Sequence, residues 1–140
     1  MAIDVTLVDS NVILDLVTDD VDWAGWSSKR LEEAALRGPL LINEVIYAEL
    51  SVRYERIEAL DAMLEEADFD VVSIGRPSLF LAGKAFKRYR ERGGSRPGVL
   101  PDFFIGAHAA VMSWPLLTRD TGRYATYFPT LTLISPASVS

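Results

Sequence analysis

Short apolar segments of β-strand character alternate along this chain with longer segments in which apolar residues recur at helical spacing. The segments expected to form strands are residues 3–8, 40–42, 71–74, 116–118 and 131–134. The segments expected to form helices are a short turn from residue 11 and residues 23–37, 43–52, 57–67, 77–92 and 101–112. This alternation predicts an α/β fold in which helices cover both faces of a mainly parallel sheet.

The length and residue types limit the protein class further. The 140 residues suit a single domain over 1–140. The absence of cysteine excludes disulfides, thiolate zinc sites and cysteine nucleophiles. Residues 1–22 contain six aspartates and neither Lys nor Arg, unlike the basic start of a signal peptide, and no apolar run approaches the roughly 20 residues of a membrane span. We therefore expect a cytoplasmic protein without a membrane segment.

Charge is distributed unevenly between the two halves of the chain. Residues 1–70 carry 17 acidic and 5 basic side chains (net −12), whereas residues 71–140 carry 3 acidic and 9 basic ones (net +6). One basic cluster consists of Lys84, Lys87, Arg88, Arg90, Arg92 and Arg96. Such a cluster can bind nucleic-acid phosphates, although an ordinary solvated helix face has the same composition. The acidic net charge of −6 therefore does not exclude a nucleic-acid ligand.

Four carboxylates stand at positions that an α/β fold uses for chemistry. Asp9 directly follows the first expected strand, Asp120 follows the fourth, Asp102 opens a helix, and Glu49 lies on a helix face with apolar neighbours. Open α/β sheets bind ligands beyond the carboxyl ends of their strands. Four anions gathered there would repel one another, and a hard divalent cation such as Mg²⁺ would compensate them. Each acid also has an ordinary explanation as a turn former, a first-turn helix acid or an ion-pair partner.

Four blocks of sequence, in order, carry a resemblance to a known family. They are VDSNVI at 8–13, EVIYAEL at 44–50, LPDFFIGAHA at 100–109 and LTRDTGRY at 117–124. These blocks resemble the acidic blocks of PIN-domain nucleases, and most closely those of the toxin ribonucleases of virulence-associated (VapC-type) toxin–antitoxin pairs. The similarity extends from Val5 to Pro136.

The resemblance implies a three-layer α/β/α fold and a metal-dependent endoribonuclease that leaves 3′-hydroxyl and 5′-phosphate ends. The family's acidic quartet falls on Asp9, Glu49, Asp102 and Asp120. By similarity, Asp9 and Asp102 would contact Mg²⁺ or Mn²⁺ most directly, and Asp120 would bind it directly or through water. Glu49 would complete the charge and orient a water molecule.

The resemblance also assigns supporting residues and partners. Asn11 and Thr118 match polar positions that support the site. The likeness implies a homodimer and a cognate antitoxin whose tail blocks the cleft. Thr121, Gly122 and Arg123 stand where some PIN nucleases have a further acid, which weighs against a second tightly held metal ion.

Several basic residues are candidates for binding an RNA substrate. They are Lys84, Lys87, Arg88, Arg92, Arg96 and Arg123. Arg119 is a further candidate, or it faces the other way along its strand. His108 lies about 240° around its helix from Asp102, which predicts a structural role for the only histidine. A single histidine cannot supply the two-histidine acid–base pair of a metal-free ribonuclease.

Two other functions compete with the nuclease. A receiver-like domain would also hold Mg²⁺ in an acidic pocket, but it needs an acceptor Asp after the third strand and a Lys after the fifth, and residues 73–75 and 135–138 provide neither. A non-catalytic PIN-like module that binds RNA or protein would keep the fold without turnover, and the intact acidic quartet argues against it.

Overall fold

A parallel five-stranded sheet forms the centre of the computed structural model, which describes residues 4–136. The strands are β1 (Thr6–Val8), β2 (Leu40–Asn43), β3 (Phe69–Val72), β4 (Leu116–Leu117) and β5 (Leu133–Ile134). They lie side by side in the order β3-β2-β1-β4-β5, and every pairing is parallel. The expected parallel sheet is therefore confirmed, except that Ile3, the expected start of the first strand, lies outside the described residues.

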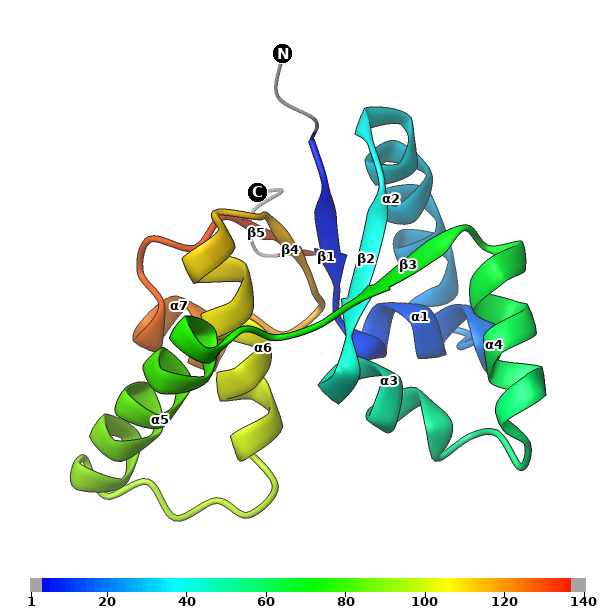
Figure 1. Ribbon diagram of the computed structural model, residues 1–140. Helices are drawn as coiled ribbons and strands as arrows, with labels where there is room; N and C mark the ends of the chain where they lie inside the picture. The colour runs from blue at the N-terminus through cyan, green and yellow to red at the C-terminus, as the bar shows by residue number, and fades with distance from the viewer. Residues whose placement is uncertain (1–3, 137–140) are drawn as a thin grey trace.

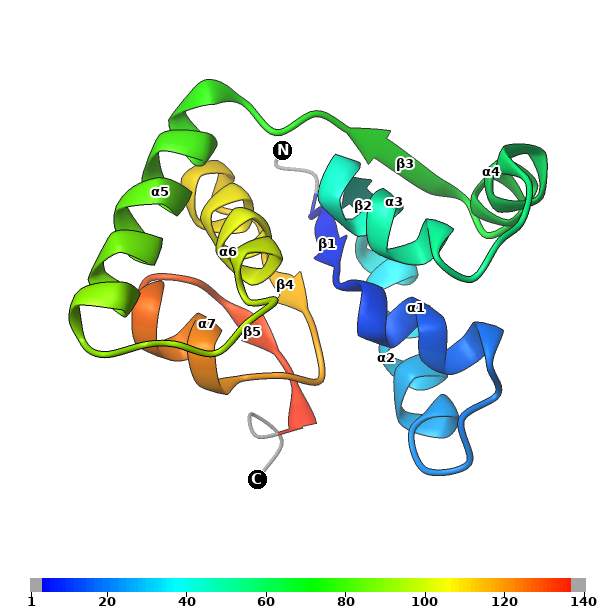
Figure 2. The ribbon, with the colours of Figure 1, turned by 90° about the horizontal axis from the view of Figure 1, so that it is seen from below.

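Seven helices within these residues surround the sheet. They are α1 (Ser10–Val17), α2 (Ala24–Arg37), α3 (Glu44–Ser51), α4 (Ile57–Glu66), α5 (Arg76–Glu91), α6 (Leu100–Met112) and α7 (Gly122–Tyr127). Helices α1 and α2 lie on one side of the sheet and α5 and α6 on the other, while α4 lies beyond the edge strand β3 (Figures 1 and 2). The expected three-layer α/β/α arrangement is confirmed.

The core consists of apolar residues from the central strands and the helix faces packed on them. Leu7, Val8, Ile42 and Leu117 are fully buried, as expected for strands covered on both faces. The helix that follows β2 begins at a side-chain cap, because the backbone N–H of Ile46 donates to Asn43 Oδ1 at 3.0 Å.

The expected structural role of His108 is confirmed. Its side chain is buried, and Nδ1 lies 3.0 Å from Nδ2 of Asn43. The ring also packs against Trp114, with 5.1 Å between ring centroids. Burial lowers the pKa of His108, which keeps the ring neutral at physiological pH.

Several sequence-based boundaries were wrong. The fifth strand is two residues shorter than expected, at Leu133–Ile134 instead of 131–134. The third strand begins two residues earlier than expected, because its pairing with β2 sets the register: Leu40 lies opposite Phe69, and Asn43 lies opposite Val72. Residues 122–129, which were given no element, contain helix α7. This six-residue helix begins with glycine and contains Tyr124, Thr126 and Tyr127, so its own helix propensity is low and packing against α6 stabilises it.

A glycine on α6 makes room for the segment that contains α7. A Cβ atom at Gly106 would lie 2.5 Å from Cε2 of Phe128 and 3.1 Å from Cδ1 of Tyr124. Both aromatic side chains are buried. The missing side chain at Gly106 therefore lets both rings pack directly on the α6 backbone.

No helix between residues 4 and 136 has the combination of length and apolar character that crossing a membrane requires.

Candidate active site

Asp9 occupies the point where β1 ends and α1 begins. Its backbone is extended (φ −67°, ψ 149°), and only 4% of its surface is exposed. One carboxylate oxygen, Oδ2, accepts hydrogen bonds from the Thr118 hydroxyl at 2.8 Å and from the Tyr124 hydroxyl at 3.0 Å. These two donors fix the orientation of the carboxylate.

Glu49 reaches the same place from α3. The Ser10 hydroxyl donates to Glu49 Oε1 at 2.8 Å and lies 3.5 Å from Asp9 Oδ1. Ser10 is buried, and its hydroxyl lies between the carboxylates of Asp9 and Glu49.

Asp102 and Asp120 reach the same end of the sheet from α6 and from the segment that follows β4. Asp102 lies in the first turn of α6 and forms an ion pair with the guanidinium of Arg123. Asp120 follows β4 and is exposed, while its backbone N–H donates to the Thr118 hydroxyl oxygen at 3.1 Å. Thr118 therefore contacts both the buried acid and the backbone of the exposed one.

The second expected supporting residue, Asn11, lies beside Thr118. Its Nδ2 lies 3.4 Å from Thr118 Oγ1, and its Oδ1 accepts from the backbone N–H of Arg119 at 3.2 Å. These contacts connect the first turn of α1 with the segment that follows β4. Asn11 and Thr118 thus have the positions expected of residues that support the acids.

Burial and mutual repulsion raise the pKa values of three of the acids. Burial raises the pKa of Asp9 to about 6; the hydrogen bonds from Thr118 and Tyr124 oppose this shift, and the charge of Glu49 adds to it. Burial also raises the pKa of Glu49, where the Ser10 hydrogen bond acts in the opposite direction and the charge of Asp102 adds a smaller increase. The site therefore contains negative charge that the protein only partly compensates.

The charges of the neighbouring acids also act on Asp102. Burial, then the charge of Asp9, raises its pKa to about 6; Arg123 opposes the shift, and the charge of Asp120 contributes to it. Asp102 thus interacts with each of the other three acids, since its charge also raises the pKa of Glu49. The four residues selected from the sequence are gathered at one site.

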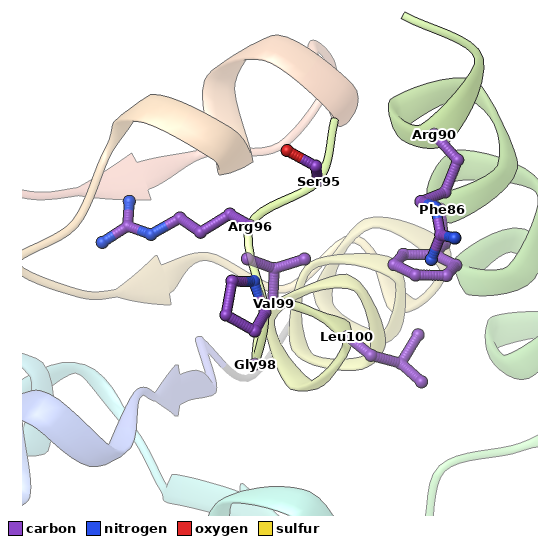
Figure 3. Close-up of a pocket in the computed structure, with 8 residues that line it drawn as sticks. Phe86, Arg90, Ser95, Arg96, Gly98, Val99 and Leu100 are labelled. Carbon is purple, nitrogen blue, oxygen red and sulfur yellow. The ribbon is translucent and has the colours of Figure 1, made fainter. Parts of the chain in front are cut away.

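A small polar cavity adjoins these acids. It has a volume of about 190 Å³, and the residues that line it are Arg96, Pro97, Gly98, Val99, Asp102, Asp120 and Arg123. A neighbouring cavity lies between α5 and the loop that precedes α6, and Figure 3 shows Phe86 and Arg90 entering it from α5. In the same view the side chain of Arg96 extends away from α5.

The six basic residues expected to bind RNA form two groups in the structure. Arg96 and Arg123 line the cavity with Asp102 and Asp120. The other four residues do not line this cavity and are exposed on α5 or at its end: Lys84, Lys87, Arg88 and Arg92. The Lys84 ammonium lies 5.1 Å from the centroid of the Phe80 ring, and the Arg92 guanidinium lies 5.6 Å from that of Tyr127.

Sequence reasoning missed two contributions to this site, those of Ser10 and Tyr124. Ser10 could have been found, because it directly follows Asp9 and carries a hydroxyl. The contact of Tyr124 with Asp9 depends on α7, which was not predicted. Arg119, a candidate for substrate binding, instead forms an ion pair with the buried Asp15, with 2.8 Å between Nε and Oδ2.

The donor set consists of oxygen atoms, which hard cations prefer. In the described part of the chain, no three carboxylate or imidazole side chains stand close enough together to hold one ion without rearrangement. Mg²⁺ commonly binds through one or two carboxylates and retains several waters, so two acids such as Asp9 and Asp102 would be enough protein ligands for it. Their raised pKa values indicate a site at which a cation would relieve repulsion.

Comparisons with known proteins identify relatives in sequence and in fold. A family model described as PIN domain matches residues 6–129. The structure is similar to that of VapBC-1 from nontypeable Haemophilus influenzae, with 18% identity, a TM-score of 0.71, and coverage of 94% of this chain and 97% of that chain. It is also similar to VapBC2 from Rickettsia felis, solved bound to a promoter DNA fragment, with 17% identity, a TM-score of 0.70, and coverage of 94% and 98%.

A third similar structure is a toxin–antitoxin complex from Klebsiella pneumoniae, with 21% identity, a TM-score of 0.63, and coverage of 94% of this chain and 97% of that chain. The comparison with curated proteins gives no significant match.

Proposed function

The chain belongs to the PIN domain family, and from this membership and the geometry of its four acids we propose that it is a Mg²⁺-dependent endoribonuclease. The observation that carries the proposal is the gathering of Asp9, Glu49, Asp102 and Asp120 at the carboxyl ends of β1 and β4. Asp9, Glu49 and Asp102 have raised pKa values, with burial as the main cause. A structural acid cluster would normally be neutralised by ion pairs, and here Arg123 provides the only one within residues 4–136.

Asp9 and Asp102 would hold the ion, with Asp120 binding directly or through water. Mn²⁺ would fit the same oxygen donors. When bound, the ion would polarise a phosphate oxygen and lower the pKa of a bound water molecule.

The protein's own residues would orient the reacting groups. Thr118 and Tyr124 hold one oxygen of Asp9, which leaves Oδ1 available on the side of Ser10. Glu49, fixed by the Ser10 hydroxyl, would accept a hydrogen bond from the attacking water. Attack on phosphorus with departure of the 3′-oxygen gives 3′-hydroxyl and 5′-phosphate ends.

Two groups of basic residues would bind the RNA. Arg96 and Arg123 lie beside the acids and would contact phosphates near the cleaved bond. The second group, Lys84, Lys87, Arg88 and Arg92, would attract the chain at longer range.

We further propose that the protein is the toxin of a toxin–antitoxin pair. The support is its structural similarity to proteins whose solved structures are VapBC or toxin–antitoxin complexes. On this proposal a cognate antitoxin blocks the acidic cleft, the toxin forms a homodimer, and cleavage takes place in the cytoplasm.

The nuclease proposal is tested by incubating purified protein with mixed RNAs, with Mg²⁺ and with EDTA, and mapping the ends. We expect cleavage only with the divalent ion. Asp102→Asn should abolish cleavage while the circular dichroism spectrum stays unchanged, and Asp70→Asn, on the exposed edge strand, is the matched control that should remain active. Mg²⁺-independent cleavage, or an active Asp102→Asn variant, would contradict the proposal. Complete inactivity of the parent would favour the non-catalytic module.

A further inference from the structure

Arg123 is paired with one of the two acids that would hold the proposed metal ion. Its guanidinium forms an ion pair with Asp102 through Oδ2. The arginine side chain is 15% exposed and the carboxylate 25% exposed, so the pair is largely shielded from water. Within the described residues, none of the other three acids has an ion-pair partner.

A guanidinium and a divalent cation cannot share one carboxylate oxygen without strong repulsion. Mg²⁺ binds oxygen at about 2.0 to 2.1 Å and demands near-octahedral geometry. Metal binding through Oδ2 of Asp102 therefore requires Arg123 to leave that oxygen.

The surroundings of Arg123 allow this movement. The residue lies in the first turn of α7, and its guanidinium carbon is 5.9 Å from the centroid of the Tyr89 ring. The adjoining cavity of about 190 Å³ is lined by Asp102, Asp120 and Arg96. An arginine released into this cavity would meet the phosphate of a bound RNA, for which a guanidinium has matching geometry.

We propose that Arg123 is an exchangeable counter-ion: it neutralises Asp102 in the metal-free protein and passes to the RNA phosphate when the divalent ion binds. This inference rests on the proposed nuclease function. It assigns to one side chain two successive partners, both anionic. Metal binding and RNA binding are then coupled, since the ion frees the arginine that the phosphate receives.

The first test measures Mn²⁺ binding by electron paramagnetic resonance, with no RNA present. Arg123→Gln removes the competitor, so we expect Mn²⁺ to bind about tenfold more tightly, which corresponds to the loss of one competing ion pair. Arg96→Gln is the matched control, because Arg96 lines the same cavity and its loss changes the net charge equally. Its effect should be clearly smaller. Equal tightening in both variants would overturn the exchange and leave only a general charge effect.

A conservative variant distinguishes the loss of charge in Arg123→Gln from a defect in its folding. Arg123→Lys keeps the charge but loses the planar fork, so its Mn²⁺ affinity should lie between those of the parent and Arg123→Gln. An affinity for Arg123→Lys equal to that of Arg123→Gln would contradict competition by charge.

The second test measures RNA affinity with Ca²⁺ and with EDTA. Arg123→Gln should weaken RNA binding several-fold with Ca²⁺ and leave it unchanged in EDTA, where Arg123 is held by Asp102. A loss of equal size under both conditions would overturn the coupling.

The two proposals fail in different ways. Cleavage by the parent without specific tightening in Arg123→Gln removes the exchange and retains the nuclease. Absence of Mn²⁺ binding in the parent and in Arg123→Gln alike removes both.

Discussion

Arg119 and Asp15 are joined by two hydrogen bonds, with 2.8 Å between Nε and Oδ2 and 2.9 Å between Nη2 and Oδ1. Asp15 is buried on α1 and also accepts from the Ser27 hydroxyl of α2 at 2.6 Å. The Arg119 guanidinium lies 5.0 Å from the centroid of the Trp23 ring. This pair connects the α1–α2 layer with the residue that directly precedes Asp120.

Replacing Asp15 with Ala should destabilise the protein by about 3 kcal/mol, because Arg119 and Ser27 would lose a shared buried partner. Urea unfolding followed by tryptophan fluorescence measures the change. The matched control is Glu33→Ala, which breaks a more exposed pair with Arg30, and should cost less than about 1 kcal/mol. Similar losses in the two variants would show that burial of the first pair has no energetic importance.

Replacing Asp9 with Asn should stabilise the metal-free protein at pH 8 by about 3 kcal/mol while abolishing cleavage. The pKa of Asp9 is about 6 in the folded protein, above its ordinary value of 3.8. Ionisation therefore costs stability as the pH rises from about 4, and the cost is complete above about 6. The gain from Asn should be absent at pH 4 and grow between pH 4 and 7.

Thermal melts in EDTA across this pH range test the Asp9 prediction. Adding Mg²⁺ at pH 8 should raise the melting temperature of the parent more than that of Asp9→Asn. A pH-independent difference between the two proteins would be inconsistent with a buried ionised carboxylate at position 9.

Replacing Tyr124 with Phe should move the acidic limb of the cleavage pH profile to higher pH. The Tyr124 hydroxyl donates to Asp9, and this hydrogen bond lowers the pKa of Asp9. Its loss leaves the carboxylate less stable relative to the protonated form. The measurement is kcat/KM against pH, and Tyr127→Phe is the control, since Tyr127 lies on the same helix. An unshifted acidic limb for Tyr124→Phe would show that the Tyr124 hydroxyl does not influence the ionisation on which cleavage depends.

Replacing both Lys87 and Arg88 with Ala should weaken RNA binding most at low salt and reduce its salt dependence. Two exposed cations on α5 would otherwise release counterions from the RNA. Fluorescence anisotropy with labelled RNA at several salt concentrations measures both quantities. The control is the pair Arg53→Ala and Arg56→Ala, which removes the same charge from exposed positions around the start of α4. If both double variants behave alike, the α5 surface has no special role.

The positions of the four acids were predictable because they depend on topology. Asp9 and Asp120 follow β1 and β4, which pair as parallel neighbours. Asp102 lies in the first turn of the long helix α6. These relationships follow from apolar segments and helix-start residues that are visible in the sequence.

The partners of the acids were less predictable, because they depend on packing. The ion pair between Arg123 and Asp102 requires α7, a short helix with little intrinsic propensity. The same helix brings Tyr124 to Asp9. For Arg119 the sequence left two alternatives open, substrate binding or the opposite face of its strand, because its position after β4 is visible in the sequence while the burial of Asp15 against it is not.

Gly106 carries no functional group, yet the hydroxyl that holds Asp9 depends on it. A methyl group there would collide with Phe128 and crowd Tyr124, whose hydroxyl donates to Asp9. The support of Asp9 in this protein therefore depends on a position that lies on the backbone of α6 and carries no charged atom.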